Sequence, residues 1–258
     1  MRQGARLGQH FLKHSWAARA LAHALGVLPG ETILEIGPGK GVLTRELLAF
    51  GPVVAIEKDE ALIELLKETL AAEIADKRLT LISADIRDVT PTSLGLKSGG
   101  YTLGANIPYY ITGEIIRQFL TSEAQPRTIA LLIQKEVAQR ITSNKESILS
   151  ISVKAYGTPH IVEKVSRTQF SPPPSVDSAI LAVTNISKNF FSDVTEEQFF
   201  DVVRAGFASK RKFVANNLSV LFDKEVVRAA MKAAGVSEKA RAENIPLTRW
   251  KDLAKRLR

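Results

Sequence analysis

The chain has 258 residues, of which 45% are apolar and 24% charged, a composition that fits a globular protein of one large domain or of a large and a small one. It contains no cysteine, no pair of histidines at metal-ligand spacing with carboxylates and no apolar run near the roughly 20 residues of a membrane span. We therefore expect a cytoplasmic protein without disulfide, metal site or membrane contact. The net charge of +8 divides into +4 for residues 1–30, −2 for 31–184 and +6 for 185–258, which suits a polyanionic partner held by both ends, although a solubilising surface explains it equally well.

Short apolar strands alternate with helices over the first 185 or so residues. In chain order we predict a helix over 15–25, a strand over 32–36, a helix over 42–50, a strand over 53–57, a helix over 60–75, strands over 79–82 and 101–105, a helix over 112–121 and a strand over 129–133. A late strand over 180–183 is expected to pair with a segment near 160–165. Such alternation favours right-handed crossovers, so the sequence predicts an α/β fold with a mostly parallel sheet.

The strand pattern stops near residue 190. Helices are predicted over 196–208, 212–221, 225–234 and 247–257. We therefore expect two domains: residues 1–188, in which 1–30 form a basic N-terminal segment and helix, and a small all-helical domain over 189–258.

A glycine-rich turn, which includes Gly37 and Gly39, lies between the first predicted strand and the following helix. Glycines there allow a tight turn and the close approach of a ligand to the backbone, although an ordinary tight turn has the same pattern. Glu57 ends the next strand, where a carboxylate is placed to accept hydrogen bonds from both hydroxyls of a ribose.

Asp85 closes the third strand, where it can accept an adenine amino hydrogen, and Ile86 supplies a backbone N–H and an apolar face to that ring. A dinucleotide enzyme would share the glycine turn and Glu57, but the spacing here is Gly-x-Gly-x-Gly and not Gly-x-Gly-x-x-Gly. Three strand ends in register, which carry the glycine turn, Glu57 and Asp85, predict instead a site for the adenosyl part of S-adenosylmethionine, in a Rossmann-like methyltransferase sheet.

Asn106-Ile107-Pro108-Tyr109 follows the fourth strand. The Asn106 amide oxygen and the Ile107 carbonyl can accept both hydrogens of a planar base amine, which favours a pyramidal and more nucleophilic nitrogen. Pro108 fixes its φ and brings no competing N–H, and the Tyr109 ring can stack on a base that has left its own stack. An Asn-led turn with a packed tyrosine would share this sequence, but together with the upstream pocket it predicts methyl transfer to a base nitrogen.

Phe170 begins a segment, 170–178, that contains three consecutive prolines. We expect this rigid segment to carry Phe170 to the other face of the base. Packing of Phe170 in the core is the alternative.

Together these residues resemble the KsgA family of ribosomal RNA adenine dimethyltransferases. The matching stretches run nearly from end to end: 8–12, 34–41, 55–57, 84–85, 106–112, 134–138, 170–179, 208–212, 216–218 and 241–243. The chain departs from the family after Arg140, because residues 141–148 lack the usual Pro-Gly loop and Tyr-Gly pair.

The resemblance implies that the enzyme dimethylates the exocyclic amines of two adjacent adenines in a hairpin loop of small-subunit rRNA during ribosome biogenesis, with that rRNA or its precursor particle as partner. It implies that His10 and Leu12 line the methionine end of the cofactor beside Gly37, and that Asn106 contacts the cofactor too. The catalytic domain would be 1–188 and the helical RNA-binding domain 189–258. Within the latter, the resemblance assigns an RNA backbone contact to Lys210, Arg211 and Lys212. Nothing calls for a dimer, so we expect a monomer.

Three other functions share part of these features. The first is the antibiotic-resistance relative that methylates an adenine of large-subunit rRNA and has the same Asn-Ile-Pro-Tyr motif. The second is a non-catalytic RNA- or DNA-binding factor on the same fold, against which the intact Asn106–Tyr109 motif argues. The third is a nicotinamide dehydrogenase, which the glycine spacing disfavours.

Overall fold

The computed structural model describes residues 10–257, which form two units. The first unit contains residues 10–138 and 158–186, and the second contains 139–157 and 187–257. Arg2 and Arg6, two basic residues of the predicted N-terminal segment, lie outside the described residues, as do Gly8 and Gln9 of the family match. No helix among residues 10–257 is long and apolar enough to cross a membrane.

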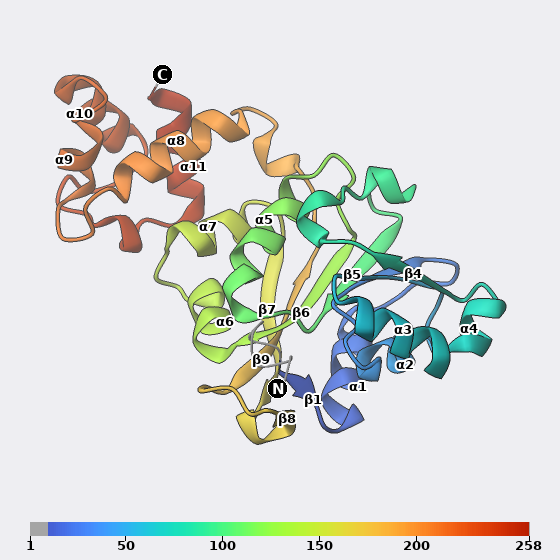
Figure 1. The fold of residues 1–258 in the computed structure, drawn as a ribbon. Coiled ribbons are helices and arrows are strands. Elements are labelled where there is room, and N and C mark those ends of the chain that lie inside the picture. The colour runs from blue at the N-terminus through green and yellow to red at the C-terminus, as the bar shows by residue number, and fades with distance from the viewer. Residues whose placement is uncertain (1–9, 258) are drawn as a thin grey trace. The chain divides into compact units, whose positions relative to one another are not determined.

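A seven-stranded sheet forms the centre of the first unit (Figure 1). Its strands, in spatial order, are β4 (Leu79–Ser83), β3 (Val53–Glu57), β2 (Thr32–Ile36), β5 (Tyr101–Ala105), β6 (Thr128–Gln134), β9 (Ser178–Thr184) and β7 (Thr158–Val165). The pairs from β4 to β6 are parallel, whereas β9 runs antiparallel to both β6 and β7. The predicted mostly parallel sheet and the late β7–β9 pair are confirmed.

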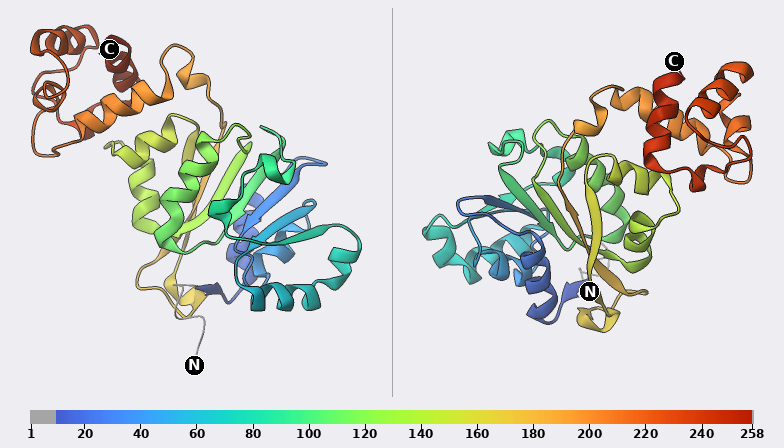
Figure 2. Two further views of the ribbon diagram at one scale, coloured as in Figure 1. Left: turned by 45° about the horizontal axis from the view of Figure 1, so that its top comes forward. Right: turned by 180° about the vertical axis from the view of Figure 1, so that it is seen from behind.

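Helices α1 (Ser15–Ala24) and α2 (Val42–Leu47) pack on one face of the sheet, and α5 (Thr112–Thr121) covers the other (Figures 1 and 2). Gly104 allows the close approach of α1, because a Cβ there would lie only 3.2 Å from the Leu25 side chain. The predicted helix 60–75 is in fact two helices, α3 (Glu60–Thr69) and α4 (Ala71–Ala75), separated at Leu70, whose φ of −127° is not helical. Helix α6 (Lys135–Thr142) leads from the first unit into the second.

Two strands of two residues each, β1 (Phe11–Leu12) and β8 (Phe170–Ser171), pair antiparallel although 158 positions separate Leu12 from Phe170. The pair joins the N-terminal segment to the proline-rich segment. Because the Leu12 and Phe170 side chains are 7% and 1% exposed, both belong to the hydrophobic core. This pairing fixes where His10 lies, one residue before β1.

The second unit is helical, with α7 (Ile148–Lys154), α8 (Glu196–Gly206), α9 (Val214–Leu218), α10 (Lys224–Ala233) and α11 (Leu247–Arg256). The predicted helix 212–221 is shorter than expected, and Lys212 precedes it in a turn. The fully buried Trp250 of α11 packs against the end of α8, where a Cβ on Gly206 would overlap its ring.

Segment 139–157, assigned above to residues 1–188, packs with the C-terminal helices. The Glu146 N–H donates to the Glu243 carbonyl at 2.7 Å, and the Tyr156 hydroxyl donates to Glu196 at 2.7 Å. The Tyr156 ring also lies 5.0 Å from that of Phe191. These contacts join residues far apart in the sequence, so local patterns did not reveal them. The catalytic and RNA-binding roles of the two domains stay predictions.

Candidate active site

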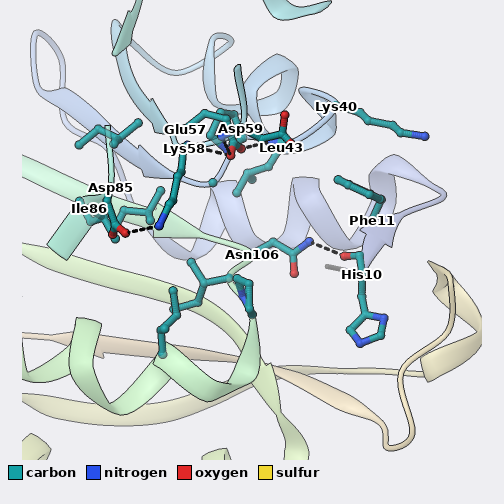
Figure 3. Close-up of a pocket in the computed structure, with 18 of the residues that line it drawn as sticks. His10, Phe11, Lys40, Leu43, Glu57, Lys58, Asp59, Asp85, Ile86 and Asn106 are labelled. Atoms are coloured by element: carbon teal, nitrogen blue, oxygen red, sulfur yellow. Dashed lines mark hydrogen bonds and ion pairs between the residues drawn. The ribbon is translucent and has the colours of Figure 1, made fainter. Parts of the chain in front are cut away.

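A pocket lies at the carboxyl ends of β2, β3 and β5, where parallel strands bring their ends to one edge of the sheet (Figure 3). It is lined by all but one of the residues predicted in the first unit, namely His10, Leu12, Gly37, Gly39, Glu57, Asp85, Ile86, Asn106, Ile107, Pro108 and Tyr109. Phe170 is the exception. Residues predicted from segments up to about a hundred positions apart in the chain thus line one pocket.

The glycine turn forms the floor of this pocket beside Phe11. Gly37 and Gly39 have φ values of 66° and 58°, which residues with a side chain rarely adopt. A Cβ on Gly37 would meet no atom within 4 Å, whereas one on Gly39 would lie 3.0 Å from the Phe11 ring. The space in front of Gly37 is therefore open to a ligand, and the turn admits it close to the backbone.

Glu57 ends β3 as a buried carboxylate, 5% exposed. Its Oε1 accepts from the backbone N–H groups of Lys58 at 2.9 Å and Asp59 at 3.0 Å, and its Oε2 accepts from that of Gly39 at 3.1 Å. A carboxylate has about four acceptor positions. Three backbone N–H groups thus occupy three of these positions and orient Glu57. A ribose whose two hydroxyls both donate to Glu57 would fill the fourth position and displace one of the backbone donors.

Replacement of Glu57 by glutamine is expected to weaken cofactor binding about tenfold, because a hydrogen bond to a charged group contributes roughly 1.5–3 kcal/mol. Glu57→Ala is expected to weaken it further, since it also leaves three N–H groups without their acceptor. Titration calorimetry with S-adenosylhomocysteine measures the effect, with the exposed Glu60→Gln as the control. Unchanged affinity in both Glu57 variants would contradict the predicted role of Glu57 in cofactor binding.

Asp85 follows β4 and is held by two cations of the pocket wall. Arg87 donates to both of its oxygens, with Nε at 3.0 Å from Oδ1. The Lys58 ammonium lies 2.8 Å from Oδ2 (Figure 3). The hydrogen bonds from Arg87, and then that from Lys58, hold the pKa of the Asp85 carboxyl well below its usual range. The carboxylate is therefore ionised, and an adenine amino group must displace one of these donors to reach it.

Asn106 lies in the centre of the pocket, between Asp85 on one side and His10 on the other (Figure 3). Its Nδ2 donates to the His10 carbonyl at 3.2 Å. Because the amide nitrogen is engaged there, the amide oxygen is left as an acceptor for a ligand. The N-terminal segment thus sets the orientation of an amide that follows it by almost a hundred residues.

Tyr109 lies next to Asn106 in the pocket, and a hydrogen bond to its hydroxyl holds its ring in place. Its hydroxyl shares a hydrogen bond of 2.7 Å with the Ser178 Oγ, and its ring centroid lies 5.9 Å from that of His10. Burial raises the pKa of the Tyr109 phenol, so the side chain is neutral at pH 7. A neutral ring anchored in this way offers a flat apolar face to a base.

The prediction that Phe170 reaches the base is not supported, and the structure has the core-packing alternative instead. Phe170 is 1% exposed in the hydrophobic core and does not line the pocket. Its pairing with Leu12 in β1–β8 turns the side chain into the core. The predicted RNA contact at Lys210–Lys212 belongs to the second unit.

Sequence reasoning missed several pocket residues. The Lys40 ammonium lies 5.2 Å from the centroid of the Phe11 ring, and Lys58 and Arg87 hold Asp85. Their only sequence signal is their position next to predicted site residues. Ser178, which anchors Tyr109, lies in the segment 170–178, but nothing in the sequence singled out its hydroxyl.

Glu35, in β2 beneath the glycine turn, is fully buried and outside the pocket wall. Neither of its oxygens has a hydrogen-bond partner among the described residues. Burial raises the pKa of this carboxyl to about 8; the nearby Thr44 hydroxyl lowers it in part, and the charge of Glu57 raises it further. Burial therefore favours the protonated, uncharged form of Glu35.

The family model described as "Ribosomal RNA adenine dimethylase" matches residues 2–258. The chain belongs to this family. The Ribosomal RNA small subunit methyltransferase A of Dehalococcoides mccartyi is 36% identical over 252 residues, which are 96% of this chain and 86% of that protein. The protein of the same name from Moorella thermoacetica is 37% identical over 97% of this chain and 91% of its own length.

Two solved structures are similar over almost the whole chain. The 23S rRNA methyltransferase ErmE matches with a TM-score of 0.79 and 27% identity, over 96% of this chain and 99% of that one. A dimethyladenosine transferase from Plasmodium falciparum matches with a TM-score of 0.78 and 24% identity, over 95% and 96% of the two chains, and shows the same fold. This member of the family is an rRNA adenine dimethyltransferase whose methyl donor is S-adenosylmethionine.

Proposed function

We propose that the enzyme dimethylates two adjacent adenines in a hairpin loop of small-subunit rRNA, on the free rRNA or on a precursor particle, during ribosome biogenesis. The choice of the small subunit rests on the relatives named Ribosomal RNA small subunit methyltransferase A, which match 96–97% of the chain. The observation that supports the chemistry is the Asn106 amide, whose nitrogen is engaged by the His10 carbonyl.

The pocket fits S-adenosylmethionine, since a buried carboxylate, Glu57, lies beside the open space in front of Gly37. In our proposal His10, Leu12 and the glycine turn hold the methionine end of the cofactor. Glu57 takes the ribose hydroxyls, and Asp85 and Ile86 take the adenine. When bound, the cofactor supplies a methyl group activated on a sulfonium.

Asn106 and Ile107 make the adenine amine, a poor nucleophile, more reactive. The lone pair of an adenine amine is delocalised into the ring, but hydrogen bonds from that amine to the Asn106 oxygen and the Ile107 carbonyl favour a pyramidal nitrogen. Tyr109 stacks on the flipped base, a contact that contributes about 1–3 kcal/mol per base. No general base is needed, because the methylated ammonium is a strong acid that loses its proton to solvent.

The RNA contact in the second unit is the basic turn Lys210–Lys212, between α8 and α9, whose three side chains are exposed. Replacement of all three by glutamine is expected to weaken RNA binding and to reduce the slope of log Kd against log salt by about 2, because each phosphate contact releases roughly 0.7–0.9 counterions. Binding titrations over a range of salt concentrations measure this. The matched control is the triple variant Arg204→Gln, Arg228→Gln and Arg249→Gln, whose cations form ion pairs. If the slope stays that of the wild type, RNA does not contact the basic turn.

The substrate is tested with labelled S-adenosylmethionine, offered together with under-methylated small subunits or with bare large-subunit rRNA. We expect label on small subunits alone, at adjacent adenines that carry two methyl groups each. The similarity to ErmE makes large-subunit rRNA the second candidate. Label on large-subunit rRNA alone would overturn our choice.

The proposal also includes the monomeric state and the cytoplasmic location expected from the sequence. A monomer has a mass of 28.2 kDa, which light scattering on the purified enzyme measures directly. A mass twice as large at micromolar concentration would contradict it.

A further inference from the structure

The turn between α8 and α9 is held by hydrogen bonds at its start, middle and end. The Asn217 Nδ2 donates to the Gly206 carbonyl at 2.6 Å and to the Ser209 carbonyl at 3.0 Å, and Asn217 itself is 5% exposed. The backbone N–H of Val214 donates to the Ala240 carbonyl at 2.9 Å. A partner that binds this turn therefore meets a backbone that is already ordered, which reduces the entropy lost on binding.

The cations of this turn differ from other basic residues of the second unit. Within residues 10–257 none of the side chains of Lys210–Lys212 forms an ion pair, whereas Arg204 pairs with Asp201 and Arg228 pairs with Glu225 in the same unit. Three consecutive unpaired cations repel one another. A polyanion relieves this repulsion, and phosphates do so at successive positions along a strand.

Phe213 follows the basic turn directly and leaves 40% of its surface exposed. Other aromatic rings of this unit pack on one another, such as Phe199 on Phe200 at 5.1 Å and Phe207 on Trp250 at 5.5 Å. No ring contact among the described residues includes Phe213. One ring is thus available to a partner, next to three unpaired cations.

Two further apolar side chains follow α9, where Val220 and Leu221 are 80% and 66% exposed. An apolar protein partner would have to cover the adjacent charges, and charged side chains are depleted at the centres of protein–protein interfaces. Single-stranded RNA suits both features, because its phosphates bind cations and its unpaired bases stack on aromatic rings. A duplex suits only the cations and not the aromatic ring, since its base faces are already stacked on one another.

We infer that Phe213 stacks on an unpaired base of the RNA whose phosphates bind Lys210–Lys212, so that this surface selects single-stranded RNA over duplex. The site contains described residues of the second unit alone and lies outside the methyl-transfer pocket. The inference rests on the proposed function only in that the substrate is RNA.

The test compares Phe213→Leu with wild-type full-length enzyme by fluorescence anisotropy, with short oligoadenylate as the single strand and an adenine–uracil duplex of equal length. We expect Phe213→Leu to bind the single strand about tenfold more weakly, because stacking contributes roughly 1–3 kcal/mol per base. Its affinity for the duplex and its salt slope are expected to be unchanged, since no phosphate contact is lost. Val226→Ala, which truncates another exposed apolar side chain of the unit, is the matched control.

Phe213→Trp provides a second measurement that does not depend on whether the leucine variant folds. Its added tryptophan emission is expected to be quenched by oligoadenylate and not by the duplex, at wild-type affinity. Wild-type binding of the single strand by Phe213→Leu, equal losses for strand and duplex, or an unquenched tryptophan would each overturn the inference. Failure of the wild-type enzyme to methylate either rRNA would overturn the proposed function instead, whatever oligoadenylate shows.

Discussion

Asn106→Ala is expected to reduce the rate of methyl transfer by at least about a hundredfold while cofactor affinity changes only a few-fold. The loss of a single preorganised polar group that acts on the reacting atoms has an effect of this size in other enzymes. In the proposed mechanism the alanine removes the oxygen that accepts the amine hydrogen, while the proposed cofactor contacts of Glu57 and Asp85 stay in place. Single-turnover rates with saturating cofactor and RNA separate the chemical step from binding.

Asn106→Asp tests the orientation of this group. The carboxylate keeps an acceptor oxygen but lacks the N–H that Asn106 donates to the His10 carbonyl. Two oxygens that face each other repel, so aspartate is expected to turn away and to retain little more activity than alanine. Wild-type transfer by Asn106→Ala would disprove the proposed role, and wild-type transfer by Asn106→Asp would show that the His10 contact is not needed.

Two substitutions of Tyr109, which lies next to Asn106 in the pocket, separate the role of its hydroxyl from that of its ring. Tyr109→Phe removes the hydrogen bond to Ser178 but keeps the ring, and is expected to lower the rate only a few-fold. Tyr109→Ala removes the stacking face, which contributes about 1–3 kcal/mol, and is expected to weaken productive RNA binding by tenfold or more. Equal effects of the two variants would mean that the hydroxyl and not the ring matters.

The carboxyl end of the sheet was predictable because each part of it has a local signal. Apolar strands followed by Gly37, Glu57, Asp85 and Asn106 can be found in the sequence one at a time, and the parallel topology then brings their ends together. The helical character of the C-terminal residues was predictable for the same reason, from periodicity within each segment.

The features that were missed depend on contacts across long stretches of chain. Strands β1 and β8 have two residues each, too few for a periodic signal, and only their pairing buries Phe170 in the core. The same pairing sets the place of His10 and hence the orientation of Asn106. Asp85 looked free to bind adenine because the sequence gives no sign that Arg87 and Lys58 hold it.

Glu35 is expected to make the stability of the enzyme fall as the pH rises from about 4.5 to about 8. Its pKa is raised from 4.5 to about 8 by burial, so between these values the folded protein keeps a proton that the unfolded chain releases. Stability then falls by about 1.4 kcal/mol per pH unit, up to roughly 5 kcal/mol in all, and no further above pH 8. Below pH 4.5 both states are protonated and Glu35 contributes no slope.

Glu35→Gln is expected to remove this slope, because the amide does not titrate. Urea unfolding of wild type and variant at several pH values from 5 to 8 measures it, and the difference between the two curves cancels all other titrating groups. Glu64→Gln, at a side chain 72% exposed, is the control and should keep the wild-type slope. Parallel curves for wild type and Glu35→Gln would show that Glu35 is ionised when folded. A pH slope of stability that disappears in Glu35→Gln would show instead that the Glu35 carboxyl is uncharged in the folded protein. In that case β2 places no second negative charge near Glu57.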